Sequence, residues 1–524
     1  MEKKTNKKEA PKIDRRTFIS AGVGLGVFSI IPDRVFAAKK MGLVPPSDKI
    51  TMVHIGCGTQ GHSELEALLH APAIEIVGVA DPNRESYNYI YWSENGLRDR
   101  LRRITGDNKW KEGVKGIPGG RNIMKEVVEA YYKRTRPGYK GTVAAEEDYR
   151  VLLDKMKDVD AVKIMSPDHL HAYQAIDCLK RGKHIIMHKP LGNKMTEAMK
   201  VVDLAKSLPL STHMMAYNSS FGNGNMDQIK KWIDAGAIGK LQEIHSWTNR
   251  PVWPQYPIIP TDKPAIPDGF NWDLYLGPAE WRDYHPQYTF CTFRGWYEFG
   301  AGAIADMGYY GLWSVFTALG LDSARSAGTR FSRVIQLNDR NGSTVPSTMI
   351  NDYSYPMAAA YRFEVPYKNG SGEIVFQWHD GGMKPQRPNG YKDDDLPIEG
   401  MMFVGDEDTI VSGFNRQDPF IVGKERAAKY ADVKGYPMKN PPSEALPDGT
   451  LRWVQMWIDG CKGKGKGAGS FELAKEVNET FNLGSVSLMC NGKKLEYNSQ
   501  TRTITNDAEA NKLLTRKVRK GWEI

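Results

Sequence analysis

A glycine turn directly after a short apolar segment constrains this chain more than any other feature. Residues Ile50 to Ile55 are apolar and partly β-branched, which predicts a buried strand. Gly56, Gly58 and Gly61 follow in G-x-G-x-x-G spacing and lead into a predicted helix from His62 to His70. In this arrangement Gly56 permits a tight turn, Gly58 lets backbone amides approach a pyrophosphate, and Gly61 lets the helix pack close to the strand.

The second half of a dinucleotide-binding unit is also present. Residues Ile74 to Ala80 predict the next strand, and Asp81 follows twenty residues after Gly61, where an acid accepts hydrogen bonds from an adenosine ribose. This carboxylate would repel a 2′-phosphate, which favours NAD, whereas Arg84 could accommodate that phosphate, so NADP stays possible. The alternative is a structural glycine turn in some other α/β protein.

Length and composition indicate a large globular protein. A chain of 524 residues, 40% hydrophobic and 25% charged, exceeds one typical core, so we expect two domains. The net charge is +9, but residues 1–37 hold eight basic and four acidic residues, which leaves about +5 for the remainder and gives little reason to expect nucleic acid. The five cysteines are scattered without a C-x-x-C pair, so neither a disulfide framework nor a metal site is predicted.

The N-terminal segment predicts export. Asp14 to Ile19 contains Arg15-Arg16 and resembles a twin-arginine signature, and the apolar stretch from Ser20 to Ile31 is too short to span a bilayer. Val35-Phe36-Ala37 fits a cleavage site. We therefore expect a signal peptide at 1–37, a periplasmic protein and no stable membrane insertion after cleavage. A retained N-terminal anchor is the alternative.

The rest of the chain predicts an α/β protein with two unlike domains. Strands alternate with helices through residues 38–218, interrupted by a polar insertion at about 88–145, which predicts a Rossmann domain with a parallel sheet. Residues 219–490 predict an α+β domain with a large, mostly antiparallel sheet, and residues 491–524 a basic tail that wraps the surface.

Two short stretches carry the predicted chemistry. Lys189 follows a predicted strand, and a lysine partly desolvated beside a cationic nicotinamide can act as a base towards a hydroxyl. Asp306 and Tyr310 are four residues apart and share a helix face, from which they could hold adjacent sugar hydroxyls or exchange a proton. The alternatives are a surface lysine before Pro190, a capping aspartate and a buried tyrosine. The many aromatic residues between 245 and 315 form either a core or a sugar-facing surface.

Several of these stretches together resemble the Gfo/Idh/MocA oxidoreductase family. They are the glycine turn, Ser166-Pro167 with His171, Gly182-Lys183-His184, Lys189-Pro190, Trp272 to Pro278, and Asp306-Met307-Gly308. The resemblance covers nearly all of residues 48–524, and the ending from Leu495 to Trp522 is similar to the exported bacterial branch. His188 takes the place of the glutamate in the family's glutamate-lysine-proline triplet, and Tyr310 that of its usual histidine.

The resemblance implies an NAD(P)-dependent oxidoreductase that acts on a sugar, cyclitol or glycoside. It implies bound NAD and a homo-oligomer formed through the C-terminal sheet. Because no free pool of NAD is expected outside the cytoplasm, we expect the nucleotide of an exported protein to be tightly held and recycled within the site. It implies that Lys189, Asp306 and Tyr310 are catalytic, that the cofactor is bound by Gly56, Gly58, Thr59, Gln60, Gly61, Asp81, Ser166, Pro167, His171, His188 and Lys189, and that the substrate is bound by Asn218, Trp253, Arg294 and Trp296. A glycosidase that works by transient C3 oxidation and elimination is the second possibility, and an inactive nucleotide- or sugar-binding relative is the third.

Overall fold

The computed structural model describes residues 48–93, 95–222, 224–253, 255, 258–332, 334–338, 344–348, 351–436 and 438–524. The predicted signal peptide at 1–37 lies outside these residues. The chain divides into two compact units, Met1–Lys49 and Ile50–Ile524, and the second unit holds every element described below. Within the described ranges, no helix has both the length and the apolar character that crossing a bilayer requires.

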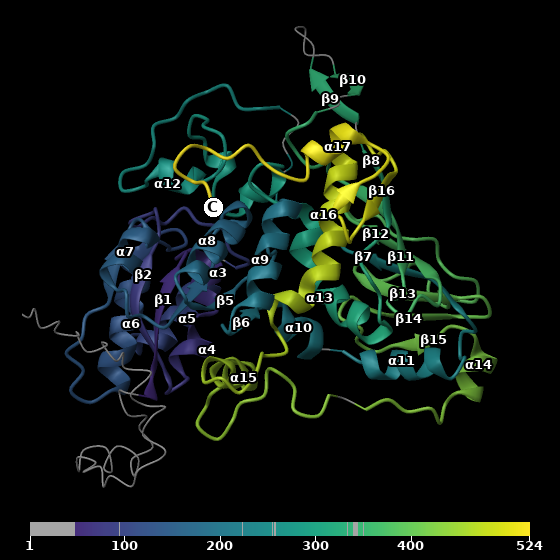
Figure 1. Ribbon diagram of the computed structural model, residues 1–524, viewed down its shortest axis with the longest axis horizontal. Coiled ribbons are helices and arrows are strands. Elements are labelled where there is room, and N and C mark those ends of the chain that lie inside the picture. Colours follow the sequence, from purple (N-terminus) through teal and green to yellow (C-terminus); the bar gives the residue numbers. More distant parts are fainter. Residues whose placement is uncertain are drawn as a thin grey trace, which may run out of the picture. The chain divides into compact units, whose positions relative to one another are not determined.

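The first half of this unit is built on a six-stranded sheet in the order β3-β2-β1-β4-β5-β6 (Figure 1). All its neighbouring pairs are parallel. The strands are β1 (Ile50–Ile55), β2 (Ile74–Ala80), β3 (Ala144–Glu146), β4 (Ala161–Ile164), β5 (His184–Met187) and β6 (Thr212–Met214). The parallel Rossmann sheet predicted from the sequence is confirmed.

Helices connect these strands and cover the sheet. They are α3 (Thr59–Ser63), α4 (Leu65–Leu69), α5 (Gly96–Thr105), α6 (Arg121–Thr135), α7 (Tyr149–Lys155), α8 (Asp168–Lys180) and α9 (Met195–Ser207). A further helix, α10 (Ala216–Gly222), follows β6 and packs against the second half. The segment predicted as an insertion supplies α5, α6 and the start of β3, so it contains the crossover between β2 and β3.

The single helix predicted from His62 to His70 is corrected by the structure. The helix begins three residues earlier, at Thr59, and divides at Glu64, where φ is −99° and ψ is 1°. The Glu64 side chain contacts Lys163 of β4 and His188, which follows β5. Lys163 and His188 lie about a hundred residues or more beyond Glu64 in the sequence. A local sequence pattern does not indicate such distant contacts, so the helix break at Glu64 could not be predicted.

The second half contains a nine-stranded sheet in the order β15-β14-β13-β7-β12-β11-β8-β16-β17. Its strands are β7 (Leu241–Trp247), β8 (Ser326–Phe331), β11 (Ala359–Pro366), β12 (Glu373–His379), β13 (Gly400–Gly405), β14 (Thr409–Gly413), β15 (Phe420–Ile421), β16 (Leu495–Asn498) and β17 (Thr503–Ile504). Among these described strands only β7 and β12 pair in parallel. The mostly antiparallel sheet is therefore confirmed. A separate ribbon pairs β9 (Val334–Asn338) with β10 (Thr344–Thr348).

The remaining helices join the two halves and complete the second one. They are α11 (Met226–Asp234), α12 (Trp272–Leu276), α13 (Gly302–Leu319), α14 (Lys424–Lys429), α15 (Arg452–Cys461), α16 (Lys475–Met489) and α17 (Ala508–Lys512), with 3-10 turns η2 (Pro286–Tyr288), η3 (Phe290–Gly295) and η4 (Phe471–Ala474). Helices α9, α13 and α16 lie between the two sheets (Figure 1). One continuous buried cluster runs from Val53 of β1 to Trp378 of β12, so the halves share a core.

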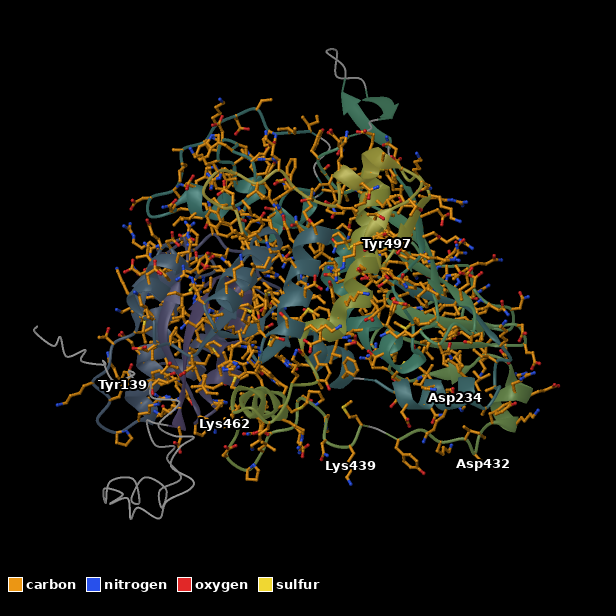
Figure 2. All side chains as sticks on the ribbon, viewed as in Figure 1. Tyr139, Asp234, Asp432, Lys439, Lys462 and Tyr497 are labelled. Carbon is orange, nitrogen blue, oxygen red and sulfur yellow. The ribbon has the colours of Figure 1, made fainter. Side chains whose placement is uncertain are left out.

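The C-terminal segment is more integrated than the sequence suggests. Residues 491–524 do more than wrap the surface as a tail, because β16 pairs with β8 and extends the large sheet. Tyr497 of β16, which is labelled in Figure 2, donates a hydrogen bond to Glu479 of α16 at 3.0 Å. The strand is only four residues long, and short strands carry weak periodicity that a sequence cannot distinguish from a loop.

Candidate active site

A cavity of about 500 Å³ lies where the two halves meet. Its lining includes the glycine turn after β1, the loops after β2, β4 and β5, and residues of η3 and α13. The carboxyl ends of parallel strands all open at one edge of a sheet, and an open α/β sheet binds its ligands there. The second half contributes the opposite wall, so the cavity combines residues from widely separated parts of the sequence.

The glycine turn forms one end of the cavity. Gly56 has φ +89°, and a Cβ atom there would lie 2.5 Å from the carbonyl carbon of Met165, so only glycine fits. A Cβ on Gly61 would lie 2.6 Å from the Gly56 carbonyl oxygen, which explains the third glycine of the motif. Gly58, Thr59 and Gln60 line the cavity, and α3 begins at Thr59, so the first amides of the helix have no partner within it.

Asp81 closes the same end. Its carboxylate accepts hydrogen bonds from the backbone amides of Cys57 and Asn83, the latter at 2.7 Å, and burial raises its pKa to about 6. Arg84 points elsewhere: it forms an ion pair with Asp268 and is not part of the cavity lining. The residue that kept NADP possible is therefore engaged by another partner.

The loops after β4 and β5 are held together by His171. Its Nδ1 lies 2.7 Å from the Pro190 carbonyl and its Nε2 lies 2.7 Å from the Ser166 carbonyl. Burial lowers the pKa of His171 to about 3, although its contacts with the two carbonyl groups act in the opposite direction. Ser166, Pro167 and His171 all line the cavity. His169, which precedes this ring by two residues, is buried and contacts the Tyr275 carbonyl through Nε2 at 2.8 Å.

A buried charge cluster occupies the other end. Lys189 forms an ion pair with Asp306 of α13, and Arg294 Nε lies 3.3 Å from the same Asp306 oxygen. Burial lowers the pKa of Lys189, Asp306 opposes that effect, and Arg294 adds to it. Burial would raise the pKa of Asp306, but the two cations lower it to about 2, so this carboxylate is ionised. The cluster can therefore hold a lysine that loses its proton more easily than a free one.

Tyr310 and His188 stand beside this cluster. Tyr310 lies one helical turn after Asp306, and Lys189 Nζ is 5.1 Å from the centre of its ring. The Tyr310 hydroxyl is 3.2 Å from His188 Nε2, and the same nitrogen is 3.3 Å from a carboxylate oxygen of Glu64. A phenol, an amine and a carboxylate thus meet around one part of the cavity.

The structure brings most of the predicted residues together. All predicted catalytic residues line the cavity, as do the predicted cofactor residues other than Gly61. Of the predicted substrate residues, Trp253 and Arg294 line it. Asn218 instead lines a second cavity of about 250 Å³, which shares His188 and Tyr310 with the first.

Trp296 is placed away from both cavities. Its side chain is fully buried in an aromatic cluster that includes Tyr288 and Phe299, and its indole N–H donates to the Gln287 carbonyl at 2.9 Å. The aromatic stretch between 245 and 315 therefore serves both purposes that its sequence left open: Trp296 belongs to a core, whereas Trp253 faces the cavity.

Sequence reasoning missed several residues of the site. Glu64 comes from the crossover between β1 and β2, and Tyr89 and Trp92 come from the loop after β2. Arg250 also lines the cavity, with its guanidinium 5.1 Å from the Trp92 ring. In the sequence, Glu64 is an acidic residue three positions after the glycine motif. Acidic residues are common on exposed helix faces, so this position did not indicate a buried site residue. Nothing in the local pattern marked it as a buried partner of His188.

The donor set suits a dinucleotide. The glycine cradle, the start of α3 and Asp81 lie at one end of a cavity whose other end holds Lys189, so a dinucleotide could extend from one to the other. Within the described ranges, no group of three or more His, Cys, Asp or Glu side chains is arranged to hold a metal ion.

Individual relatives match only parts of this chain. The alpha-N-acetylgalactosaminidase of Shewanella oneidensis is 23% identical over 214 residues, 41% of this chain and 38% of that protein. The levoglucosan dehydrogenase of Pseudarthrobacter phenanthrenivorans is 37% identical over 94 residues, 18% of this chain and 23% of that protein. The chain thus spans less than half the length of these curated relatives. The crystal structure of the WlbA dehydrogenase from Bordetella pertussis, in complex with NADH and UDP-GlcNAcA, has a TM-score of 0.49 and 13% identity, covering 86% of this chain and 99% of that one.

Two family models match in succession along the chain. The model described as an oxidoreductase family with an NAD-binding Rossmann fold matches residues 127–215, which include Lys189 and the loops after β4 and β5. The model described as the C-terminal alpha/beta domain of an oxidoreductase family matches residues 223–343, which include Asp306 and Tyr310. The two matches thus cover Lys189 on one side of the cavity and Asp306 and Tyr310 on the other, and over residues 127–215 and 223–343 the chain is similar to the Gfo/Idh/MocA oxidoreductase family.

Proposed function

We propose that this protein is an NAD-dependent oxidoreductase that removes hydride from a hydroxyl-bearing carbon of a sugar, cyclitol or glycoside. The observation that carries the proposal is the single cavity with a glycine cradle and Asp81 at one end and the Lys189–Asp306 ion pair at the other. When bound, the nicotinamide would supply the hydride acceptor. Relatives that match parts of the chain include a levoglucosan dehydrogenase, which supports a carbohydrate substrate.

In this proposal the substrate hydroxyl lies beside Lys189. The neutral amine of Lys189 takes the hydroxyl proton, and its lowered pKa makes that form more available near neutral pH. Asp306 and Tyr310 orient the ring through its neighbouring hydroxyls. The indole N–H of Trp253 is buried and has no hydrogen-bond partner among the described residues, so it is a candidate donor to a substrate oxygen.

The experiment that tests the proposal is a mass spectrum of the small molecules released when the purified native protein is denatured. We expect NAD or NADH, because we further propose that the nucleotide is held tightly and recycled within the site. Incubation with a panel of sugars, uronic acids, cyclitols and glycosides should then change the absorbance of bound nicotinamide at 340 nm. No nucleotide in the protein, and no reduction of added NAD or NADP by any compound, would overturn the proposal and favour the inactive relative.

A glycosidase is the second candidate. Relatives that match two fifths of the chain include an alpha-N-acetylgalactosaminidase, and the same hydride step at C3 would acidify a neighbouring C–H and permit elimination of the aglycone. Measuring released sugar against NADH for one chromogenic glycoside separates the two. A glycosidase releases sugar without net NADH, whereas a dehydrogenase accumulates NADH without releasing the aglycone.

Export and assembly complete the proposal. We propose that the twin-arginine-like segment at 1–37 directs the folded protein to the periplasm, which suits a nucleotide loaded before export and five cysteines without a predicted pairing. Replacing Arg15-Arg16 with two lysines should retain a reporter fusion in the cytoplasm.

We also propose a homo-oligomer formed through the large sheet. Its outward positions include Arg362 and Glu364 of β11, so charge reversal there should weaken an oligomer seen by light scattering.

A further inference from the structure

Glu64 makes contacts that the proposed chemistry does not use. It stands at the break between α3 and α4, and its side chain is 16% exposed. One carboxylate oxygen lies 3.3 Å from His188 Nε2 and accepts a hydrogen bond from Gln60 Nε2 at 2.7 Å. The other oxygen lies 3.3 Å from Nζ of Lys163, whose side chain is completely buried. This acid is therefore placed by three partners from three elements.

These partners keep Glu64 ionised. Burial would raise the pKa of Glu64, but His188 and Lys163 hold it well below its usual range. An ionised carboxylate can only accept hydrogen bonds. Each nitrogen that approaches it at hydrogen-bond distance must consequently carry a proton.

That requirement fixes the proton of His188. If Nε2 carried no hydrogen, its lone pair would face the Glu64 carboxylate, which is repulsive. With a hydrogen on Nε2, the ring donates towards Glu64 and towards the Tyr310 hydroxyl oxygen, 3.2 Å away. The Tyr310 oxygen then accepts from His188, so its own O–H must point in another direction.

We propose that Glu64 and His188 are positioning residues that turn the Tyr310 hydroxyl into a donor facing the substrate. Glu64 holds the proton of His188 on Nε2, and that N–H holds the Tyr310 oxygen. The Tyr310 O–H is then free for a substrate oxygen on the side where Lys189 lies over the same ring. The inference rests on the proposed function, because it takes the acceptor in the cavity to be the substrate.

The tautomer of His188 can be measured without any activity assay. Proton–nitrogen correlation spectra of histidine-labelled protein distinguish a ring protonated on Nε2 from one protonated on Nδ1, and His188→Gln identifies the signal by removing it. The wild-type signal should show the Nε2–H form. Glu64→Gln should release the ring to the other form or to a mixture. An unchanged signal in Glu64→Gln would overturn the proposal.

Two further variants protect this test from a folding artefact. Glu64→Asp keeps a negative charge near Lys163 but withdraws it from His188, so it should change the tautomer as Glu64→Gln does. Lys163→Met removes the other partner and leaves the Glu64–His188 contact, so the Nε2–H form should persist. The opposite result would contradict the proposal. If Lys163→Met loses the Nε2–H form and Glu64→Asp keeps it, then Glu64 serves only the buried ion pair with Lys163 and does not position His188.

Kinetics provide an independent arm once a substrate is known. Glu64→Gln should lower kcat about tenfold with little change in the amount of NAD that stays bound, because the orienting contact is lost while the glycine cradle is intact. The double variant Glu64→Gln/His188→Gln should be no slower than His188→Gln alone, since both residues act on Tyr310 through one chain. Additive losses would contradict the proposal. A wild-type protein with the expected tautomer but no turnover would instead contradict the proposed function.

Discussion

The two ends of the cavity are built in opposite ways. The cofactor end is built around the stretch between Ile50 and Asp81, and the key contacts of that stretch involve backbone atoms and glycines. The chemical end is made by side chains whose elements are far apart in the sequence, from Glu64 to Tyr310, and its key contacts involve buried charges. The cofactor end depends on local backbone conformation, and the chemical end depends on tertiary packing. Substitutions at one end should therefore change NAD binding, and substitutions at the other should change turnover.

The largest effect is expected from Lys189→Met, which should damage only the chemical end. Removing the amine takes away the proposed base, so kcat should fall about 10³-fold while NAD binding stays near its wild-type value. Steady-state kinetics and a cofactor titration would measure both. If turnover survives, the base lies elsewhere, and the ion pair with Asp306 is only structural.

Trp296 and Trp253 divide the aromatic stretch between core and site. Trp296→Leu leaves a void in a buried cluster and should lower the free energy of unfolding by about 3 kcal/mol with a small change in KM. Trp253→Leu should instead reduce kcat/KM roughly fivefold, about 1 kcal/mol, through lost substrate contact. Denaturant unfolding and kinetics on both variants would show whether the two roles have been assigned the wrong way round.

Gly56→Ala should damage the cofactor end. A side chain there meets the backbone of Met165 at a positive φ, so we expect a loss of about 2 kcal/mol of stability together with weaker NAD binding. Gly182→Ala is the matched control, because φ is +73° but no atom lies within 4 Å of the new Cβ. It should cost about 1 kcal/mol and leave NAD binding unchanged. If the two substitutions change NAD binding equally, the glycine turn at Gly56 is not part of the NAD-binding site.

The pH dependence of kcat/KM tests the charge cluster. Oxidation requires neutral Lys189, so the rate should rise with pH through the Lys189 pKa. Asp306 raises that pKa and Arg294 lowers it, so Asp306→Asn should move the rise to lower pH and Arg294→Met should move it to higher pH. Asp306 itself has a pKa of about 2 and stays ionised throughout. Shifts in the same direction for both variants would mean that Lys189 is not the titrating group.

The smallest effect is expected from Arg84→Ala. Its partner Asp268 is exposed, so the stability should change by less than about 1 kcal/mol. The preference for NAD over NADP should also stay the same, because the arginine does not line the cavity. The affinities of the wild type and of Arg84→Ala for NAD and NADP would test this. A change in NADP affinity would indicate that Arg84 contacts the adenosine ribose or its 2′-phosphate.

The strands and the glycine turn were predictable because their signals are local. The bounds of β1 and β2 agree with those expected from their apolar runs. The helix break at Glu64 and the addition of β16 to the large sheet were not predictable, because each depends on contacts with residues more than a hundred positions away. Lys189 and Asp306 were identified as candidates separately, and only the resemblance connected them.

The sequence by itself determined the Rossmann unit, the spacing of the glycines and the acid at the end of the second strand, since each follows from backbone geometry over a few residues. The tertiary structure alone decided which charges meet. Lys189, Arg294 and Asp306 share one buried cluster, and Glu64 supplies a carboxylate beside His188, where the family triplet has a glutamate. The physical reason is that burial and Coulomb attraction depend on distances in space, and the separation of two residues along the chain does not determine that distance.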